Sequence, residues 1–192
     1  MTTGMSMIET LRDFINKMDR LRVEYMVTGS YAMSAYGEIR MTKDIDVVVQ
    51  LAARHAHSFF DLFKDDYDVS ETSIRRAIDL ASMFNIVSLT HGGKIDCILL
   101  KDSDFARTSF ARRYKESVAG IEFWTTTRED LIVAKLSWAR DTHSELQIRD
   151  IVSLITTEYD TNYVTDWIDR LGLHSIWSEV EEWKIQHKPL EN

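Results

Sequence analysis

The sequence predicts an α+β fold, in which a mixed sheet flanked by helices precedes a helical C-terminal part. Three observations predict it. Short β-branched runs alternate with stretches of helical spacing in the first two thirds of the chain. Only helical patterns remain afterwards, and the change near residue 127 is the one boundary that the sequence offers. We therefore expect a core at 1–126 and a helical segment at 127–192 that packs on it.

The N-terminal half is predicted to alternate helix and strand. The first helix repeats apolar residues at intervals of three and four. The run DIDVVVQL is rich in valine and predicts a strand, while Ser30 and Gly37 suit the start and the end of a short helix. In order, we expect a helix at 7–21, a strand at 23–29, a short helix at 30–37, a strand at 44–51 and helices at 52–66 and 71–82.

Two hairpins are predicted next. The strands at 84–89 and 94–100 are joined across a Gly-Gly turn, and those at 114–118 and 121–125 across Ala119-Gly120. A helix at 102–113 separates the two hairpins. From residue 128 onward the spacing predicts helices alone.

Composition excludes several classes of protein. The chain has 192 residues with 44% hydrophobic and 28% charged residues, which is typical of a folded protein. No stretch approaches the roughly 20 apolar residues of a membrane helix, and the N-terminus lacks a signal-peptide pattern. The lone Cys97 excludes an intramolecular disulfide, so we expect a cytoplasmic protein without a membrane partner. A net charge of -8 argues against a DNA-coating surface but leaves room for a local basic groove.

Two aspartates at the head of a buried strand indicate a metal site. Side chains on a strand alternate between faces, so Asp44 and Asp46 project from one side while Ile45 faces the core. Carboxylates this close repel one another unless a cation neutralises them. Magnesium prefers oxygen ligands and is usually held by a few carboxylates together with substrate phosphates. The pair is therefore predicted to hold a metal ion.

Two further features extend this site. Gly29-Ser30 joins a strand to a helix start, where free backbone N–H groups and a glycine suit a phosphate. Asp96 lies on a later strand whose other face carries apolar residues. If that strand pairs with the strand of Asp44, three carboxylates converge, as a two-metal centre for phosphoryl or nucleotidyl transfer requires.

The pattern of glycine-serine, a spacer, Asp-hydrophobic-Asp and a distant strand aspartate resembles the polymerase-β-type nucleotidyltransferase superfamily. The stretch GSYAMSAYGEIRMTKDIDVVV is most similar to the small AbiEii-like, toxin-type nucleotidyltransferases, and EDLIVAKLSWARDTHSELQIRDIVSLI resembles their Lys-then-Asp helical motif. The resemblance covers residues from about 23 to 155 and implies a nucleotidyltransferase fold with its catalytic core at 1–126. The spacer here is toward the long end of the family pattern.

The resemblance also implies roles and partners. Asp44, Asp46 and Asp96 would be catalytic and would bind Mg²⁺ or Mn²⁺, with Asp96 as a possible base. Gly29 and Ser30 would hold nucleotide phosphates. Lys135 would meet the triphosphate, and Asp150 would lie near the same cleft. The implied reaction moves a nucleoside monophosphate from a nucleoside triphosphate such as ATP to an acceptor hydroxyl of a tRNA, a protein or a small molecule.

Other interpretations of these residues stay open. The implied alternative function is a catalytically inactive nucleotidyltransferase-fold protein that binds a toxin or antitoxin partner. Asp-x-Asp also occurs in sugar-nucleotide glycosyltransferases, which need a larger nucleotide-binding domain than this chain has room for. Gly29 and Ser30 could serve only as a turn and a helix cap, Asp96 could be an edge-strand surface residue, and Lys135 could be a solvated helix residue. Arg40, Thr42 and Lys43 could contact phosphate or pair with the aspartates.

Overall fold

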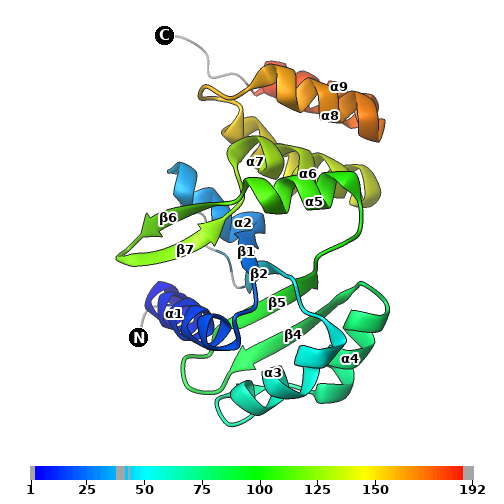
Figure 1. The fold of residues 1–192 in the computed structure, drawn as a ribbon. Coiled ribbons are helices and arrows are strands. Elements are labelled where there is room, and N and C mark those ends of the chain that lie inside the picture. The colour runs from blue at the N-terminus through cyan, green and yellow to red at the C-terminus, as the bar shows by residue number, and fades with distance from the viewer. Residues whose placement is uncertain (1–2, 38–41, 43, 188–192) are drawn as a thin grey trace. The chain divides into compact units, whose positions relative to one another are not determined.

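The structure is a computed structural model that describes residues 3–37, 42 and 44–187. It divides into two compact units, Met1–Thr126 and Thr127–Asn192. The first unit contains all the strands found among the described residues, and the second contains helices (Figure 1).

A mixed sheet forms the centre of the first unit. In the described part of the chain it has seven strands in the order β3-β4-β5-β2-β1-β7-β6. Strand β2 runs antiparallel to β1 and parallel to β5, so both kinds of pairing occur. The strands are β1 Tyr25–Thr28, β2 Asp44–Val49, β3 Tyr67–Asp68, β4 Met83–Ser88, β5 Lys94–Leu99, β6 Tyr114–Val118 and β7 Ile121–Thr125. The predicted α+β class is confirmed.

Helices connect and flank these strands (Figure 1). They are α1 Thr3–Leu21, α2 Gly29–Ala32, α3 Ala56–Phe63, α4 Glu71–Asp79 and α5 Asp104–Arg112, with 3₁₀ turns η1 Met33–Tyr36 and η2 Ala53–His55. The short helix predicted at 30–37 is therefore α-helical only in its first part. Both predicted hairpins are present as antiparallel pairs, β4 with β5 and β6 with β7.

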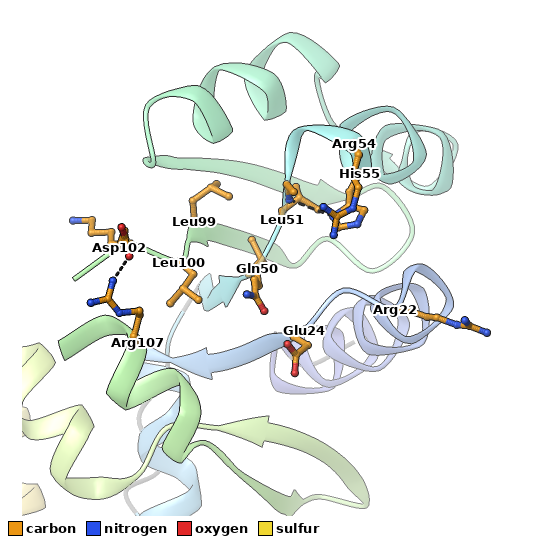
Figure 2. A pocket seen from close by; sticks show the side chains of 13 residues that line it. Arg22, Glu24, Gln50, Leu51, Arg54, His55, Leu99, Leu100, Asp102 and Arg107 are labelled. Carbon is orange, nitrogen blue, oxygen red and sulfur yellow. Dashed lines mark hydrogen bonds and ion pairs between the residues drawn. The ribbon is translucent and has the colours of Figure 1, made fainter. Parts of the chain in front are cut away.

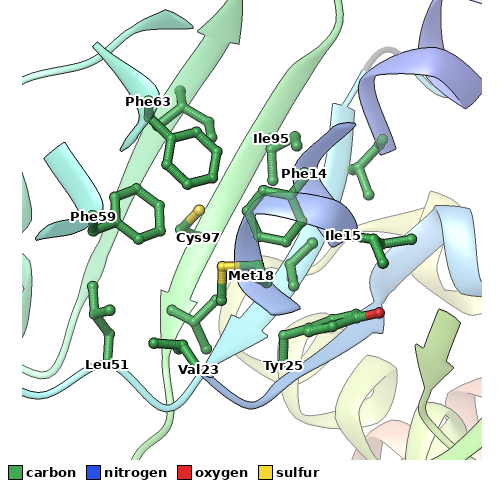
Figure 3. Packing of buried hydrophobic residues seen from close by; sticks show 14 of the residues in the cluster. Phe14, Ile15, Met18, Val23, Tyr25, Leu51, Phe59, Phe63, Ile95 and Cys97 are labelled. Atoms are coloured by element: carbon green, nitrogen blue, oxygen red, sulfur yellow. The ribbon is translucent and has the colours of Figure 1, made fainter. Parts of the chain in front are cut away.

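One face of the sheet is covered by α1 and α3 and holds the main core. Phe14 of α1 lies against Phe63 of α3, with ring centroids 5.8 Å apart, and Phe63 stacks on Phe59 at 4.3 Å. Figure 3 shows these rings beside Cys97 and Ile95 of β5. Cys97 is fully buried, on the face of β5 opposite the carboxylates. The core therefore holds β2 and β5 by their buried face, and the aspartates stand on the opposite face.

The second unit consists of α6 Arg128–Thr142, α7 Glu145–Leu154, α8 Thr161–Leu171 and α9 His174–Gln186. Thr127 and Asp160 begin α6 and α8 by accepting hydrogen bonds from the backbone N–H groups of Asp130 and Tyr163. Leu131, Leu136 and Ile151 are buried. In the part of the chain described here, no helix is long and apolar enough to cross a membrane.

Candidate active site

Strand β2 presents Asp44 and Asp46 on one face because its residues alternate strictly in burial. Ile45, Val47 and Val49 are fully buried on the core face. The two aspartates stand on the other face and are partly exposed. The predicted alternation is therefore present, and the apolar residues anchor the strand that carries the carboxylates.

Strand β5 brings the third carboxylate beside this pair. It runs parallel to β2 in a register that places Asp96 opposite Asp46. Neighbouring strands lie about 4.8 Å apart, so the two aspartates are adjacent on the same face. β5 lies between β4 and β2, and Asp96 is only 7% exposed. The alternative of an edge-strand surface residue is therefore wrong.

Lys94 lies beside Asp44, Asp46 and Asp96, which together form the carboxylate cluster, and it was not among the predicted site residues. Its Nζ atom donates a hydrogen bond to Asp96 Oδ2 at 2.9 Å and lies 3.5 Å from Asp44 Oδ2. The hydrogen bond to Asp96 raises the pKa of the Lys94 ammonium, which therefore stays charged near neutral pH. The signal was present in the sequence, because Lys94 precedes Asp96 by two residues and so shares its face of the strand.

The turn at Gly29 lies directly against Asp46. Thr28 of β1 is the register partner of Asp46, and Gly29 begins α2 with a φ of +63°. A Cβ atom at this position would lie 2.0 Å from Asp46 Oδ2. Only glycine suits both the backbone conformation and this approach. Gly29 and the partly exposed Ser30 thus lie beside the carboxylates.

The three aspartates provide donors that suit a divalent cation. Asp96 Oδ1 is buried and has no hydrogen-bond partner, which is costly for a carboxylate oxygen and fits a ligand position for a cation. In the conformation described, no set of three acidic, histidine or cysteine side chains among the described residues is arranged to hold a metal ion. The donor chemistry fits magnesium, and Lys94 now contacts two of the three carboxylates.

The other predicted residues have different surroundings. In the second unit Lys135 Nζ donates to Asp150 Oδ2 at 2.7 Å and to Gln147 Oε1 at 3.1 Å. Lys135 and Asp150 are both buried, so Lys135 is not the solvated helix residue of the alternative interpretation. Their predicted part in binding a triphosphate stays a prediction.

Arg40, Thr42 and Lys43 were predicted to contact phosphate or to pair with the aspartates. Of these, Thr42 contacts the backbone of Asp44. Its hydroxyl donates to the carbonyl oxygen of Asp44 at 2.9 Å. Arg40 and Lys43 lie outside the described residues.

A separate cavity of about 550 Å³ lies at the opposite end of β2 and β5, past Val49 and Leu99. None of the predicted site residues lines it. Figure 2 shows Arg54 and Arg107 on opposite sides of Gln50, and Arg107 forms an ion pair with Asp102. The carboxylate cluster is therefore distinct from this cavity and stands at the beginning of the two parallel strands.

No protein-family model matches the sequence, and no curated protein does so either. Solved structures do resemble it. A solution structure of the antibiotic-resistance factor ANT(2'')-Ia has a TM-score of 0.62 at 14% identity and covers 97% of this chain and 100% of its own. A crystal structure of ANT(2'')-Ia with adenylyl-2''-tobramycin has a TM-score of 0.53 at 12% identity, covering 94% and 98%.

Two further proteins resemble this chain. An antigenic nucleotidyltransferase-like protein from Paracoccidioides brasiliensis has a TM-score of 0.54 at 16% identity, covering 91% of this chain and 92% of its own. The lincosamide antibiotic adenylyltransferase LnuA, bound to lincomycin, has a TM-score of 0.50 at 14% identity, covering 76% and 94%. At such identities the likeness establishes the fold. The chain has the nucleotidyltransferase fold, and none of the structures named here is described as AbiEii-like.

Proposed function

We propose that this chain is a metal-dependent nucleotidyltransferase that moves a nucleoside monophosphate from a nucleoside triphosphate to an acceptor hydroxyl. The observation that carries the proposal is the convergence of Asp44, Asp46 and Asp96 on adjacent strands of a nucleotidyltransferase fold. Gly29 adds to it, because its backbone approaches Asp46 more closely than any residue with a side chain allows.

In this proposal the chain positions the reactants and neutralises charge. A bound Mg²⁺ or Mn²⁺ ion would supply Lewis-acid stabilisation of the phosphate oxygens, with Asp44, Asp46 and Asp96 as its ligands. The Gly29-Ser30 turn would hold phosphates. Asp96 would accept the proton of the acceptor hydroxyl while that oxygen bonds to the α-phosphorus, and the bond to the bridging oxygen would break to release pyrophosphate.

We also propose a small hydroxylated molecule as the acceptor. Support comes from two structural neighbours, one crystallised with adenylyl-2''-tobramycin and one with lincomycin. The net charge of -8 disfavours a long nucleic acid, because an acidic surface repels phosphates. Lys135 and Asp150 remain proposed triphosphate contacts. To bind a phosphate, the Lys135 ammonium would have to give up its hydrogen bond to Asp150.

The experiment follows transfer of label from nucleoside triphosphates labelled at the α-phosphate. Each triphosphate is incubated with Mg²⁺ and a cell extract, which is then separated into RNA, protein and small molecules. We expect label in the small-molecule fraction with the wild type and with Asp79→Asn, an exposed aspartate on α4. The Asp44→Asn and Asp46→Asn variants should transfer at least about a hundredfold more slowly.

Three outcomes would contradict the proposal in different ways. Undiminished transfer by Asp44→Asn and Asp46→Asn would show that these carboxylates do not form the metal site. Label in RNA or protein would overturn the acceptor class alone. If no triphosphate donates label although Mg²⁺ and a triphosphate raise the melting temperature, the chain would be a binding protein rather than an enzyme.

A further inference from the structure

The cavity past the ends of β2 and β5 is large enough to hold a small molecule. Its volume of about 550 Å³ lies within the roughly 300–1,000 Å³ of small-molecule sites. All of its lining residues belong to the first unit. Asp46 lies three residues before Val49 of the cavity wall, which is about 10 Å of extended strand. The cavity and the carboxylate cluster are therefore separate places along β2.

The acidic groups in the wall of this cavity already have basic partners. The wall contains two carboxylates, those of Glu24 and Asp102. Glu24 forms an ion pair with Arg113, and Asp102 forms one with Arg107. Neither carboxylate is therefore left to neutralise the other basic groups of the wall.

Three further cations line the cavity, and these have no acidic partner among the described residues. Arg22, Arg54 and Lys101 are exposed, and none of them forms an ion pair in the described part of the chain. The chain as a whole carries a net charge of -8, so the charge balance of this wall is opposite to that of the whole chain. A cleft lined by unpaired charges of one sign concentrates ions of the opposite sign.

Arg54 and Lys101 lie on the two segments that leave the parallel strands. The N–H of Leu100 donates to the carbonyl oxygen of Val49 at 3.0 Å, so β2 and β5 are still paired where they end. Lys101 is the next residue after Leu100, and Arg54 lies in η2, which follows β2. Both cations thus reach the same cavity from neighbouring chain segments.

The wall also contains neutral hydrogen-bond donors. The N–H of Ala52 donates to Nδ1 of His55 at 3.2 Å, so the hydrogen of the imidazole ring is on Nε2. Burial and the charge of Arg54 lower the pKa of His55, which is therefore neutral near pH 7. Gln50 adds a side-chain amide, and Figure 2 shows it between Arg54 and Arg107.

We propose that this cavity binds a small molecule with two or more phosphate groups, and that Arg54 and Lys101 are its cationic contacts. Two phosphate groups allow one ligand to contact both cations. Arginine binds phosphate as a two-pronged donor and lysine binds it as a compact charge. A phosphate group has three strong acceptor oxygens, which suits a wall that offers charged and neutral donors together. The site goes beyond the proposed function, because it uses none of the residues assigned to nucleotidyl transfer.

The test measures pyrophosphate binding to the full chain by isothermal titration calorimetry in EDTA, where no metal ion can bridge pyrophosphate to the carboxylate cluster. We expect pyrophosphate to bind more tightly than inorganic phosphate. Arg54→Ala and Lys101→Ala should each weaken pyrophosphate binding about fivefold, and the double variant about twentyfold or more. Coulomb's law for two unit charges about 4 Å apart in water gives about fivefold for each lost charge.

Two variants serve as controls. Arg76→Ala removes the same charge from an exposed arginine of α4 that does not line the cavity, and its pyrophosphate affinity should match that of the wild type. Arg54→Lys keeps the charge and should bind more tightly than Arg54→Ala. Circular dichroism checks the fold of each variant.

The results that would overturn this inference are distinct from those that concern nucleotidyl transfer. No binding of pyrophosphate at millimolar concentration would exclude the site. Equal pyrophosphate affinities of Arg54→Ala, Lys101→Ala and Arg76→Ala would exclude it as well, because binding would then occur elsewhere on the chain. If citrate binds more tightly than pyrophosphate, the assignment to phosphate groups is wrong.

Discussion

Replacing Gly29 by alanine should displace Asp46 and destabilise the first unit. The added Cβ would stand 2.0 Å from Asp46 Oδ2, where 3.0 Å is the shortest approach that Cβ atoms make, so a shift of at least 1.0 Å is required. Forcing an atom into a filled site costs about 1–3 kcal/mol. The left-handed backbone, with a φ of +63°, adds about 1–2 kcal/mol for a residue with a Cβ. We expect a loss of about 2–5 kcal/mol in the free energy of unfolding.

Gly120→Ala is the matched control, because Gly120 also has a positive φ, +76°, but a Cβ there would meet nothing within 4 Å. Urea unfolding followed by circular dichroism should give a larger loss of stability for Gly29→Ala, by about 1–3 kcal/mol. Mn²⁺ binding should weaken in Gly29→Ala alone, because the substitution would displace Asp46, a proposed metal ligand, by about 1 Å. Equal losses of stability together with equal Mn²⁺ affinities would refute the close approach of Gly29 to Asp46.

Three further predictions concern buried groups. Lys135→Met should lower the free energy of unfolding by about 3–5 kcal/mol because it leaves Asp150 buried without its ammonium, and adding Asp150→Leu should recover most of that loss in urea titrations. Burial raises the pKa of the Cys97 thiol, so iodoacetamide at pH 8 should modify the chain only after unfolding, as mass spectrometry would show. Burial raises the pKa of Tyr25 to about 12. Between about pH 10 and 12 the unfolded chain therefore loses a proton that the folded chain keeps, so stability should fall as the pH rises, and less steeply in Tyr25→Phe.

Local patterns predicted most of the elements because each pattern has a short-range cause. The hairpin at Ala119-Gly120 was predictable from Gly120, because glycine readily adopts the positive φ that a tight β-turn needs. Strand β3 has only two residues and no alternation of its own, so its pairing with β4 depends on tertiary structure. The 3₁₀ geometry of η1 likewise has no sequence signal as clear as that of an α-helix.

The site was predictable to the extent that alternation along one strand determines it. Asp44 and Asp46 share a face because strand residues alternate, and this holds for any partner strand. Their pairing with Asp96 depends on how β2 and β5 align, which the sequence allowed but did not require. The contact of Lys94 with Asp44 depends on that register, because a shift of one residue would place both Lys94 and Asp96 on the face opposite to Asp44 and Asp46.

The cost of the cluster explains why its rigidity comes from the core. Two like charges about 5 Å apart repel by roughly 3 kcal/mol at an effective dielectric constant of 20. Asp46 and Asp96 can remain neighbours because Ile45 and Cys97, on the opposite face of the same strands, are fully buried. A positive charge relieves the repulsion among the carboxylates most when it lies close to a carboxylate of each strand. Lys94 occupies that position, with its ammonium within reach of Asp44 on β2 and Asp96 on β5, and the exposed Lys101 does not.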